Sequence, residues 1–144
     1  MVALHPKRVL VPTDFSDEAS RAVDDGLALV ETPEQLTVVH VAPSMVHWEG
    51  DPIVDSSMPS DESRADHLRK VLHKKFADKK YEKVRFEVLF GSPAREIARF
   101  AENDGTELIV LPSHGRTGRA CLMIGSVAEH VVRLAHCPVL VLRD

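Results

Sequence analysis

The residues best suited to bind a charged ligand lie in one segment near the carboxyl end of the chain. The run Pro112-Ser113-His114-Gly115 follows apolar residues at 108–111, and nine residues then separate Gly115 from Gly125-Ser126. Glycine lets the backbone approach an anion closely, and the free N–H groups in the first turn of a helix point at that anion. A strand that leads through a glycine-bearing loop into a helix therefore predicts a phosphate-binding segment here.

Asp14 is the second candidate, because it follows a short apolar run at 8–11 and the pair Pro12-Thr13. A carboxylate at the end of a strand can accept hydrogen bonds from ribose hydroxyls or coordinate a hard cation. Simpler roles stay open for two of these residues, since Asp14 and Ser126 can each cap the helix that follows.

Short apolar runs alternate with helical patterns along the whole chain. Strands are predicted at residues 8–11, 36–41, 84–89, 108–111 and 139–142. Helices are predicted after Ser16, over 65–76, after Ser92 and after Ser126. Strands separated by helices run parallel, with crossovers that cover both faces of the sheet. The chain, residues 1–144, is therefore expected to form a single three-layer α/β/α domain around a five-stranded parallel sheet.

Details within these elements are also predicted from local patterns. The last helix is expected to begin with a capping box formed by Ser126 and Glu129. Its buried stripe is predicted to consist of Val127, Val131 and Leu134. His40, in the second strand, is interpreted as a structural residue, and the segment 43–60 is predicted to be a long loop.

The strand order decides which loops meet, because ligands of open α/β sheets bind beyond the carboxyl ends of the strands where the order reverses. In the order 3-2-1-4-5, Asp14 faces the loop at 112–115. In the order 2-1-3-4-5, Asp14 faces Gly91-Ser92 instead. The first order is favoured, since the loop after the fourth strand carries glycines, basic residues and a helix start. The loop after the third strand is too short to surround a ligand.

Charge and composition restrict the possible partners. The net charge is −4 and the pI is about 6.0, so there is no basic excess for binding nucleic acid. No apolar run approaches the roughly 20 residues that span a bilayer, and the N-terminus lacks the apolar core of a secretory signal. Cys121 and Cys137 are interpreted as reduced thiols. We expect a cytoplasmic protein with neither a membrane nor a nucleic-acid partner.

Motifs for fast catalysis are missing from the sequence. Neither the Gly-x4-Gly-Lys-Ser/Thr phosphate loop nor the Gly-x-Ser-x-Gly nucleophile elbow occurs. The pair His136-Cys137 has no second pair at zinc-binding spacing, so no metal held by protein side chains alone is expected. No catalytic residue is therefore assigned.

These residues resemble the signature of the universal stress protein family, Gly-x2-Gly-x9-Gly-Ser/Thr. Its fixed positions correspond to Pro112, Gly115, Gly125 and Ser126. The strand ending Val-Pro-Thr-Asp-Phe-Ser at 11–16, the run Gly-Ser-Pro-Ala at 91–94 and the closing Cys-Pro-Val-Leu-Val at 137–141 are also similar to family landmarks. The resemblance covers nearly the whole chain, and it implies the strand order 3-2-1-4-5.

The resemblance also implies partners and a ligand. The last strand, Val139 to Leu142, would form a homodimer. In one branch of the family, ATP binds at the switch point together with a divalent ion, Mg²⁺ or Mn²⁺. Carried over by position, the residues at adenine and ribose would be Pro12, Thr13, Asp14 and Val41. Those at the phosphates would be Gly115, Arg116, Gly125, Ser126 and Val127, with Pro112 in place of the first motif glycine.

Three functions stay open after this comparison. The first is a universal stress protein that binds ATP as a regulatory or sensing ligand. The second is a nucleotide-free dimeric adaptor of the same family, because Pro112 lacks an N–H and has a fixed φ. The third is a slow ATPase, with His114 and Asp14 near the phosphates.

Overall fold

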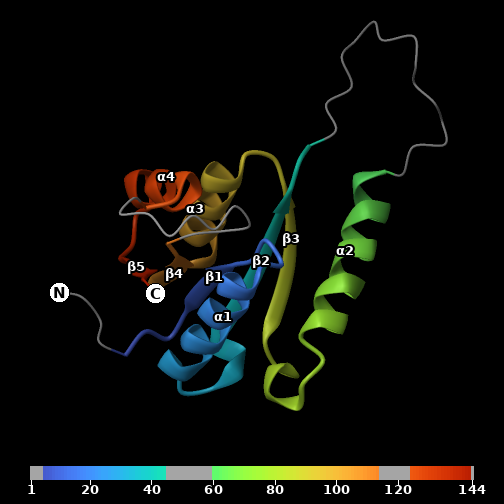
Figure 1. The fold of residues 1–144 in the computed structure, drawn as a ribbon, viewed down its shortest axis with the longest axis horizontal. Coiled ribbons are helices and arrows are strands. Elements are labelled where there is room, and N and C mark those ends of the chain that lie inside the picture. Colours follow the sequence, from blue (N-terminus) through green and yellow to red (C-terminus); the bar gives the residue numbers. More distant parts are fainter. Residues whose placement is uncertain (1–4, 45–59, 114–123, 144) are drawn as a thin grey trace, which may run out of the picture.

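A computed structural model describes residues 5–44, 60–113 and 124–143 of the chain (Figure 1). The strands are β1 (Val9–Pro12), β2 (Leu36–Ala42), β3 (Arg85–Phe90), β4 (Leu108–Pro112) and β5 (Val139–Leu142). The helices are α1 (Asp17–Leu29), α2 (Asp61–Lys75), α3 (Pro93–Asp104) and α4 (Ser126–Leu134), with short 3₁₀ helices η1 (Pro33–Gln35) and η2 (Lys79–Tyr81) before β2 and β3. Every predicted strand is present, and its ends differ from the predicted ones by one residue at most.

The strands form a five-stranded parallel sheet in the order β3-β2-β1-β4-β5. This arrangement confirms the favoured strand order. β1 lies in the centre, where Val9 pairs with Leu36 of β2 on one side and with Leu108 of β4 on the other. The order reverses between β1 and β4, so the segments that follow these two strands meet at the same edge of the sheet.

Two apolar clusters attach the helices to opposite faces of the sheet. Val9 and Val11 of β1 belong to a buried cluster with α1 and α2. Leu10 belongs to a second cluster, with Ile97 of α3 and Val131 of α4. Because successive side chains of a strand point to opposite faces, these two clusters confirm the three-layer α/β/α arrangement visible in Figure 1.

The start of α4 corrects one sequence prediction. Gly125 is the N-cap, Ser126 is the first helical residue, and no side chain caps this end. The Gly125 amide donates to the Ser113 carbonyl at 2.7 Å, which ties the residue before the helix to the end of β4. The cap therefore lies one residue earlier than predicted, and the prediction of a capping box formed by Ser126 and Glu129 is wrong.

The buried face of α4 also differs from the predicted stripe. Val131 is buried as expected, but Val127 and Leu134 are 41% and 43% exposed. The helix instead packs against the sheet through Ala128 and Val131, with Ala135 contacting the same cluster. This face is rotated by about one residue from the predicted one, which leaves two large apolar side chains in solvent.

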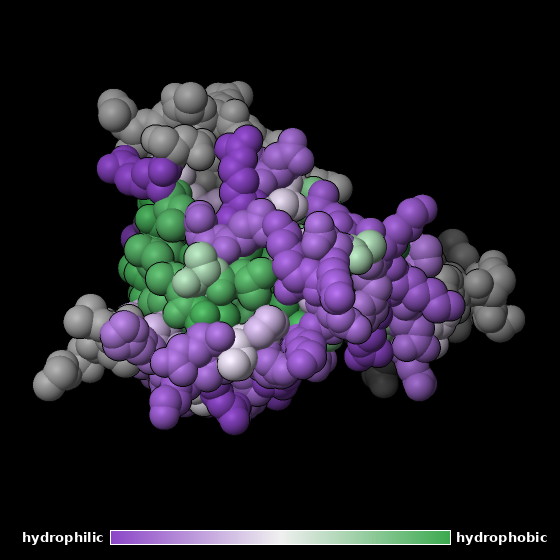
Figure 2. Space-filling view, turned by 90° about the horizontal axis from the view of Figure 1, so that it is seen from below, coloured by the Kyte–Doolittle hydropathy of each residue, from purple (hydrophilic) through white to green (hydrophobic). Residues whose placement is uncertain are grey.

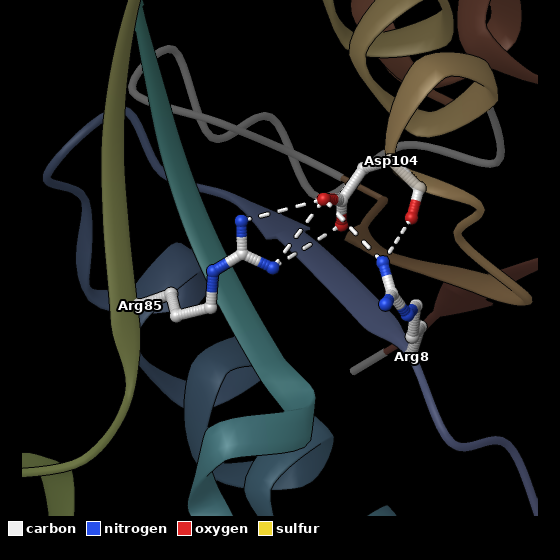
Figure 3. Close-up of polar contacts among 3 residues, drawn as sticks. All are labelled: Arg8, Arg85 and Asp104. Atoms are coloured by element: carbon white, nitrogen blue, oxygen red, sulfur yellow. Dashed lines mark hydrogen bonds and ion pairs between the residues drawn. The ribbon is translucent and has the colours of Figure 1, made fainter.

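An ion cluster joins α3 to the amino ends of the strands, opposite the carboxyl ends (Figure 3). The Asp104 carboxylate, at the end of α3, accepts from both terminal nitrogens of Arg85 at 3.3 Å and lies 3.7 Å from Arg8 Nη1. Arg8 also donates to the Asp104 carbonyl, which is one of the last carbonyls of the helix. The Asp104 side chain is only 17% exposed, so its charge is partly shielded from water and depends on these two cations.

Replacing Asp104 with asparagine should destabilise the fold by about 1–2 kcal/mol, because two charged hydrogen-bond donors lose their acceptor charge. Asp66 provides a matched control, since its pair with Arg69 joins two exposed side chains one helical turn apart. Asp66→Asn should cost less than about 0.5 kcal/mol. Urea unfolding measures both changes, and equal losses would contradict a special role for Asp104.

Two further expectations concern the thiols and a membrane. Cys137 has a free thiol whose pKa is raised by burial, while Cys121 lies outside the described residues. Within the described parts of the chain, no helix combines the length and hydrophobicity needed to cross a bilayer.

Candidate functional site

A pocket of about 280 Å³ lies beyond the carboxyl ends of β1, β2 and β4, where the strand order reverses. Its size is close to the roughly 300 Å³ at which small-molecule sites begin. The described residues that line it are Pro12, Thr13, Asp14, Ala19, His40, Val41, Pro93, Ile97, Leu111, Pro112, Ser113, Gly125, Ser126, Val127 and Ala128. The walls are thus formed by the ends of three strands and by the amino ends of α3 and α4.

The turn between β1 and α1 is held by several hydrogen bonds. The Thr13 amide donates to the Val39 carbonyl at 2.8 Å, and the Thr13 hydroxyl accepts from the Phe15 amide at 3.1 Å. The Asp14 carboxylate accepts from the Ser16 amide at 3.0 Å. The Ser16 hydroxyl is the cap of α1, as predicted. Asp14 is therefore fixed within the turn and does not take the cap position.

Pro112 ends β4 at the pocket without weakening the pairing with β5. The amides of Ile109 and Ser113 donate to the carbonyls of Pro138 and Leu142, at 3.0 and 2.9 Å. Amides along a strand alternate in direction, so an amide hydrogen at position 112 would point away from β5 and toward β1. Proline has no amide hydrogen, and its presence here therefore removes a donor on the pocket side only.

Pro12 has the same effect on the facing strand. The Thr13 amide bonds to β2, so the backbone nitrogen of the preceding residue, Pro12, faces β4. The pairing of β1 with β4 already ends at Leu10 and Ile109. Neither Pro12 nor Pro112 can donate across the gap that follows. The gap between the ends of β1 and β4 therefore receives no main-chain donor from either proline.

Two helix termini give the opposite wall a positive potential. Ser126 and Val127, in the first turn of α4, line the pocket together with Pro93, the first residue of α3. The first N–H groups of a helix have no partner within the helix, and the helix dipole adds partial positive charge at that end. Asp14 is the acidic residue among the described lining residues, which include neither Lys nor Arg. This arrangement suits a ligand with an anionic end and a hydroxyl-bearing end.

Comparison with known proteins identifies the family. The family model described as "Universal stress protein family" matches residues 5–143. The chain belongs to the universal stress protein family. One curated member, a universal stress protein of Methanocaldococcus jannaschii, is 36% identical over 142 residues, covering 95% of this chain and 82% of that protein.

Solved structures of universal stress proteins share the fold. UspA from Lactobacillus plantarum superposes with a TM-score of 0.68 at 24% identity, covering 98% of this chain and 99% of the other. A universal stress protein of Archaeoglobus fulgidus, solved in complex with dAMP, superposes with a TM-score of 0.60 at 21% identity, covering 99% and 100%. Both comparisons confirm the fold expected from the family resemblance.

The structure brings together the described members of the predicted universal stress protein site. These members are Pro12, Thr13, Asp14, Val41, Pro112, Gly125, Ser126 and Val127, and all of them line the pocket. Gly115 and Arg116 lie outside the described residues, as do His114 and most of the segment 43–60.

The pocket also contains residues that the sequence analysis did not assign to the site. His40 and Pro93 line it, as does Ser113, which is buried. A signal for His40 exists in the sequence, because it precedes Val41 at the end of the second predicted strand. Residues at the carboxyl end of a strand beside the switch point are expected to border the ligand crevice.

Proposed function

We propose that this universal stress protein binds ATP, with Mg²⁺ or Mn²⁺, as a regulatory ligand in the stress response. The observation that carries the proposal is the lining of one pocket by Asp14 and by the amino end of α4. A helix amino end suits phosphate groups, and a carboxylate after the first strand suits ribose hydroxyls. The Archaeoglobus fulgidus protein, which has the same fold, is solved with the adenine nucleotide dAMP. Its complex supports a nucleotide as the class of ligand.

The divalent ion would be held mainly by the nucleotide. The described residues contain no group of three or more His, Cys, Asp or Glu side chains that could hold a metal. Asp14 and Ser126 line the pocket and carry oxygen atoms. Mg²⁺ commonly takes one or two protein oxygens together with phosphate oxygens and water. These residues therefore fit an ion that arrives with ATP and neutralises part of its charge.

Calorimetric titration of the purified protein with ATP and Mg²⁺ tests the proposal. We expect saturable heat and an increase of the melting temperature at millimolar ATP, both reduced when EDTA removes the ion. A titration with GTP measures the preference for adenine. If neither heat nor a thermal shift occurs at millimolar ATP, the proposal is wrong.

Replacing Pro112 with glycine should tighten ATP binding by about three- to tenfold, since it restores one amide donor on the pocket side of β4. Pro112→Ala restores the same amide but keeps a β-carbon, so it separates the effect of the donor from that of space. Calorimetry on the three proteins gives the comparison. Unchanged affinity in both variants would show that the ligand does not use this amide.

A nucleotide-free adaptor is the second candidate function, and the prolines at positions 12 and 112 favour it. Both remove main-chain donors from the gap between β1 and β4, which lowers the number of groups that could hold phosphate there. The protein is purified from fresh lysate and denatured, and mass spectrometry of the small molecules that it releases distinguishes the two candidates. An adenine nucleotide that co-purifies excludes the adaptor, and a nucleotide-free protein that also fails the ATP titration supports it.

We also propose that β5 pairs with β5 of a second copy. β5 is an edge strand, and its Leu142 carbonyl accepts from β4, so the backbone groups of Val139 and Val141 point to the open edge. Large apolar side chains of α4 and β5 are exposed beside it: Val132, Leu134 and Leu140. Figure 2 shows hydrophobic surface gathered on one side of the molecule. An open apolar edge favours strand pairing between chains.

Val141→Pro should convert the dimer to monomer, because it removes an outward amide and spares the ladder to β4. Proline is tolerated on an edge strand when the missing N–H faces outward. Light scattering at micromolar concentration measures the assembly, and the melting temperature checks the fold. Leu140→Pro is the control, since it removes an inward amide and should unfold β5. A parent protein that is monomeric, or a variant that remains dimeric, would contradict this pairing.

A further inference from the structure

His40, which the sequence analysis interprets as structural, lines the pocket and contacts the turn between β1 and α1 through its ring. It lies near the end of β2, and its ring nitrogen Nδ1 is 2.9 Å from the Thr13 carbonyl oxygen. A carbonyl oxygen carries no hydrogen, so Nδ1 must be the donor in this bond. In the neutral ring, the proton is then on Nδ1 and Nε2 is unprotonated.

The bond to His40 fixes a peptide unit at the edge of the pocket. The Thr13 carbonyl belongs to the same planar peptide as the Asp14 amide, so holding the carbonyl also fixes the direction of that amide. Thr13 is bonded on its other side as well, since its amide donates to Val39. β2 therefore holds both backbone groups of Thr13, and the carbonyl is held through the side chain of His40.

The ring of His40 also supports an unusual backbone conformation. Phe15 has a φ of 67°, in the left-handed region that residues with a side chain rarely adopt. Its ring lies against the imidazole, with 4.5 Å between ring centroids. Backbone in a sparsely populated region persists where the surroundings fix it, and such sites cluster at ligand clamps.

We propose that His40, with its proton on Nδ1, is a positioning residue of the nucleotide pocket. It holds the Thr13–Asp14 peptide and the Phe15 turn in the conformation that presents Asp14 to the ligand. This inference rests on the proposed ATP binding, and it adds a residue from β2 that acts through the β1–α1 turn.

Two substitutions separate positioning from simple packing. The side-chain amide of asparagine can place its nitrogen where Nδ1 lies and donate to the same carbonyl, whereas leucine has a similar size and no donor. His40→Asn should keep the ATP dissociation constant within about threefold, and His40→Leu should raise it about tenfold, the effect expected for one lost hydrogen bond. Leu72→Ala, on the buried face of α2, is the stability control: it should lower the melting temperature and leave ATP affinity unchanged.

Nitrogen NMR of the parent protein provides a measurement that needs no variant. We expect the proton of neutral His40 on Nδ1, and a proton on Nε2 instead would overturn the inference. If the parent binds ATP and His40→Leu binds it equally well, or if His40→Asn is no better than His40→Leu, the inference is wrong while the proposed function stands. If the parent binds no ATP, the proposed function fails first, and the positioning role fails with it.

Discussion

Replacing Asp14 with asparagine should weaken ATP binding by about 10- to 100-fold, the range expected for the loss of a hydrogen bond to a charged group. The asparagine oxygen can still accept from the Ser16 amide, a bond that measures 3.0 Å with the carboxylate. The turn between β1 and α1 should therefore keep its shape. The variant removes the charge and keeps this bond, so lost affinity reports the charge of the carboxylate.

Asp66→Asn is the charge-matched control for this experiment. Asp66 lies exposed on α2 and pairs with Arg69 within the same helix, outside the residues that line the pocket. The substitution Asp66→Asn removes the same charge from the protein as Asp14→Asn does. Because Asp66 does not line the pocket, this substitution should leave ATP affinity unchanged. Calorimetry at constant Mg²⁺ compares the three proteins. An equal loss in both variants would mean that net charge, and not contact at Asp14, governs binding.

The sequence was sufficient to predict the sheet because its three central strands, β2, β1 and β4, are largely buried on both faces. Such strands are continuous apolar runs separated by helical patterns, and the parallel arrangement follows from that alternation. The choice between two strand orders depended on the chemistry of the loop after β4. Asp14 and Gly125 both line the pocket in the resulting order, which explains why local chemistry could indicate topology.

The sequence could not predict features that depend on tertiary contacts. The cap of α4 was placed one residue late because the bond from the Gly125 amide to Ser113 joins segments twelve residues apart. His40 was interpreted as structural because a strand pattern indicates a face and not the partner of a ring nitrogen. Its bond to Thr13 crosses from β2 to the turn after β1, and no spacing in the chain encodes that contact.

Gly26→Ala should destabilise the protein by about 1–2 kcal/mol, although alanine is the better helix former. Gly26 lies within α1, where the helix crosses the sheet. A β-carbon at this position would lie 2.7 Å from Val11 Cγ2 and 3.2 Å from Leu36 Cδ1. Both neighbours are fully buried in the central strands. Valine has few rotamers, so α1 or β1 must shift to make room.

A second substitution tests whether space is the cause. Val11→Ala opens a cavity at the point of contact, and it should destabilise the parent by itself. In the double variant, the β-carbon at position 26 fills part of that cavity, so the combined loss should be smaller than the sum of the two single losses. Urea unfolding of the four proteins gives the coupling energy. If Gly26→Ala is as stable as the parent, or if the two losses simply add, close packing of α1 on β1 does not explain the glycine.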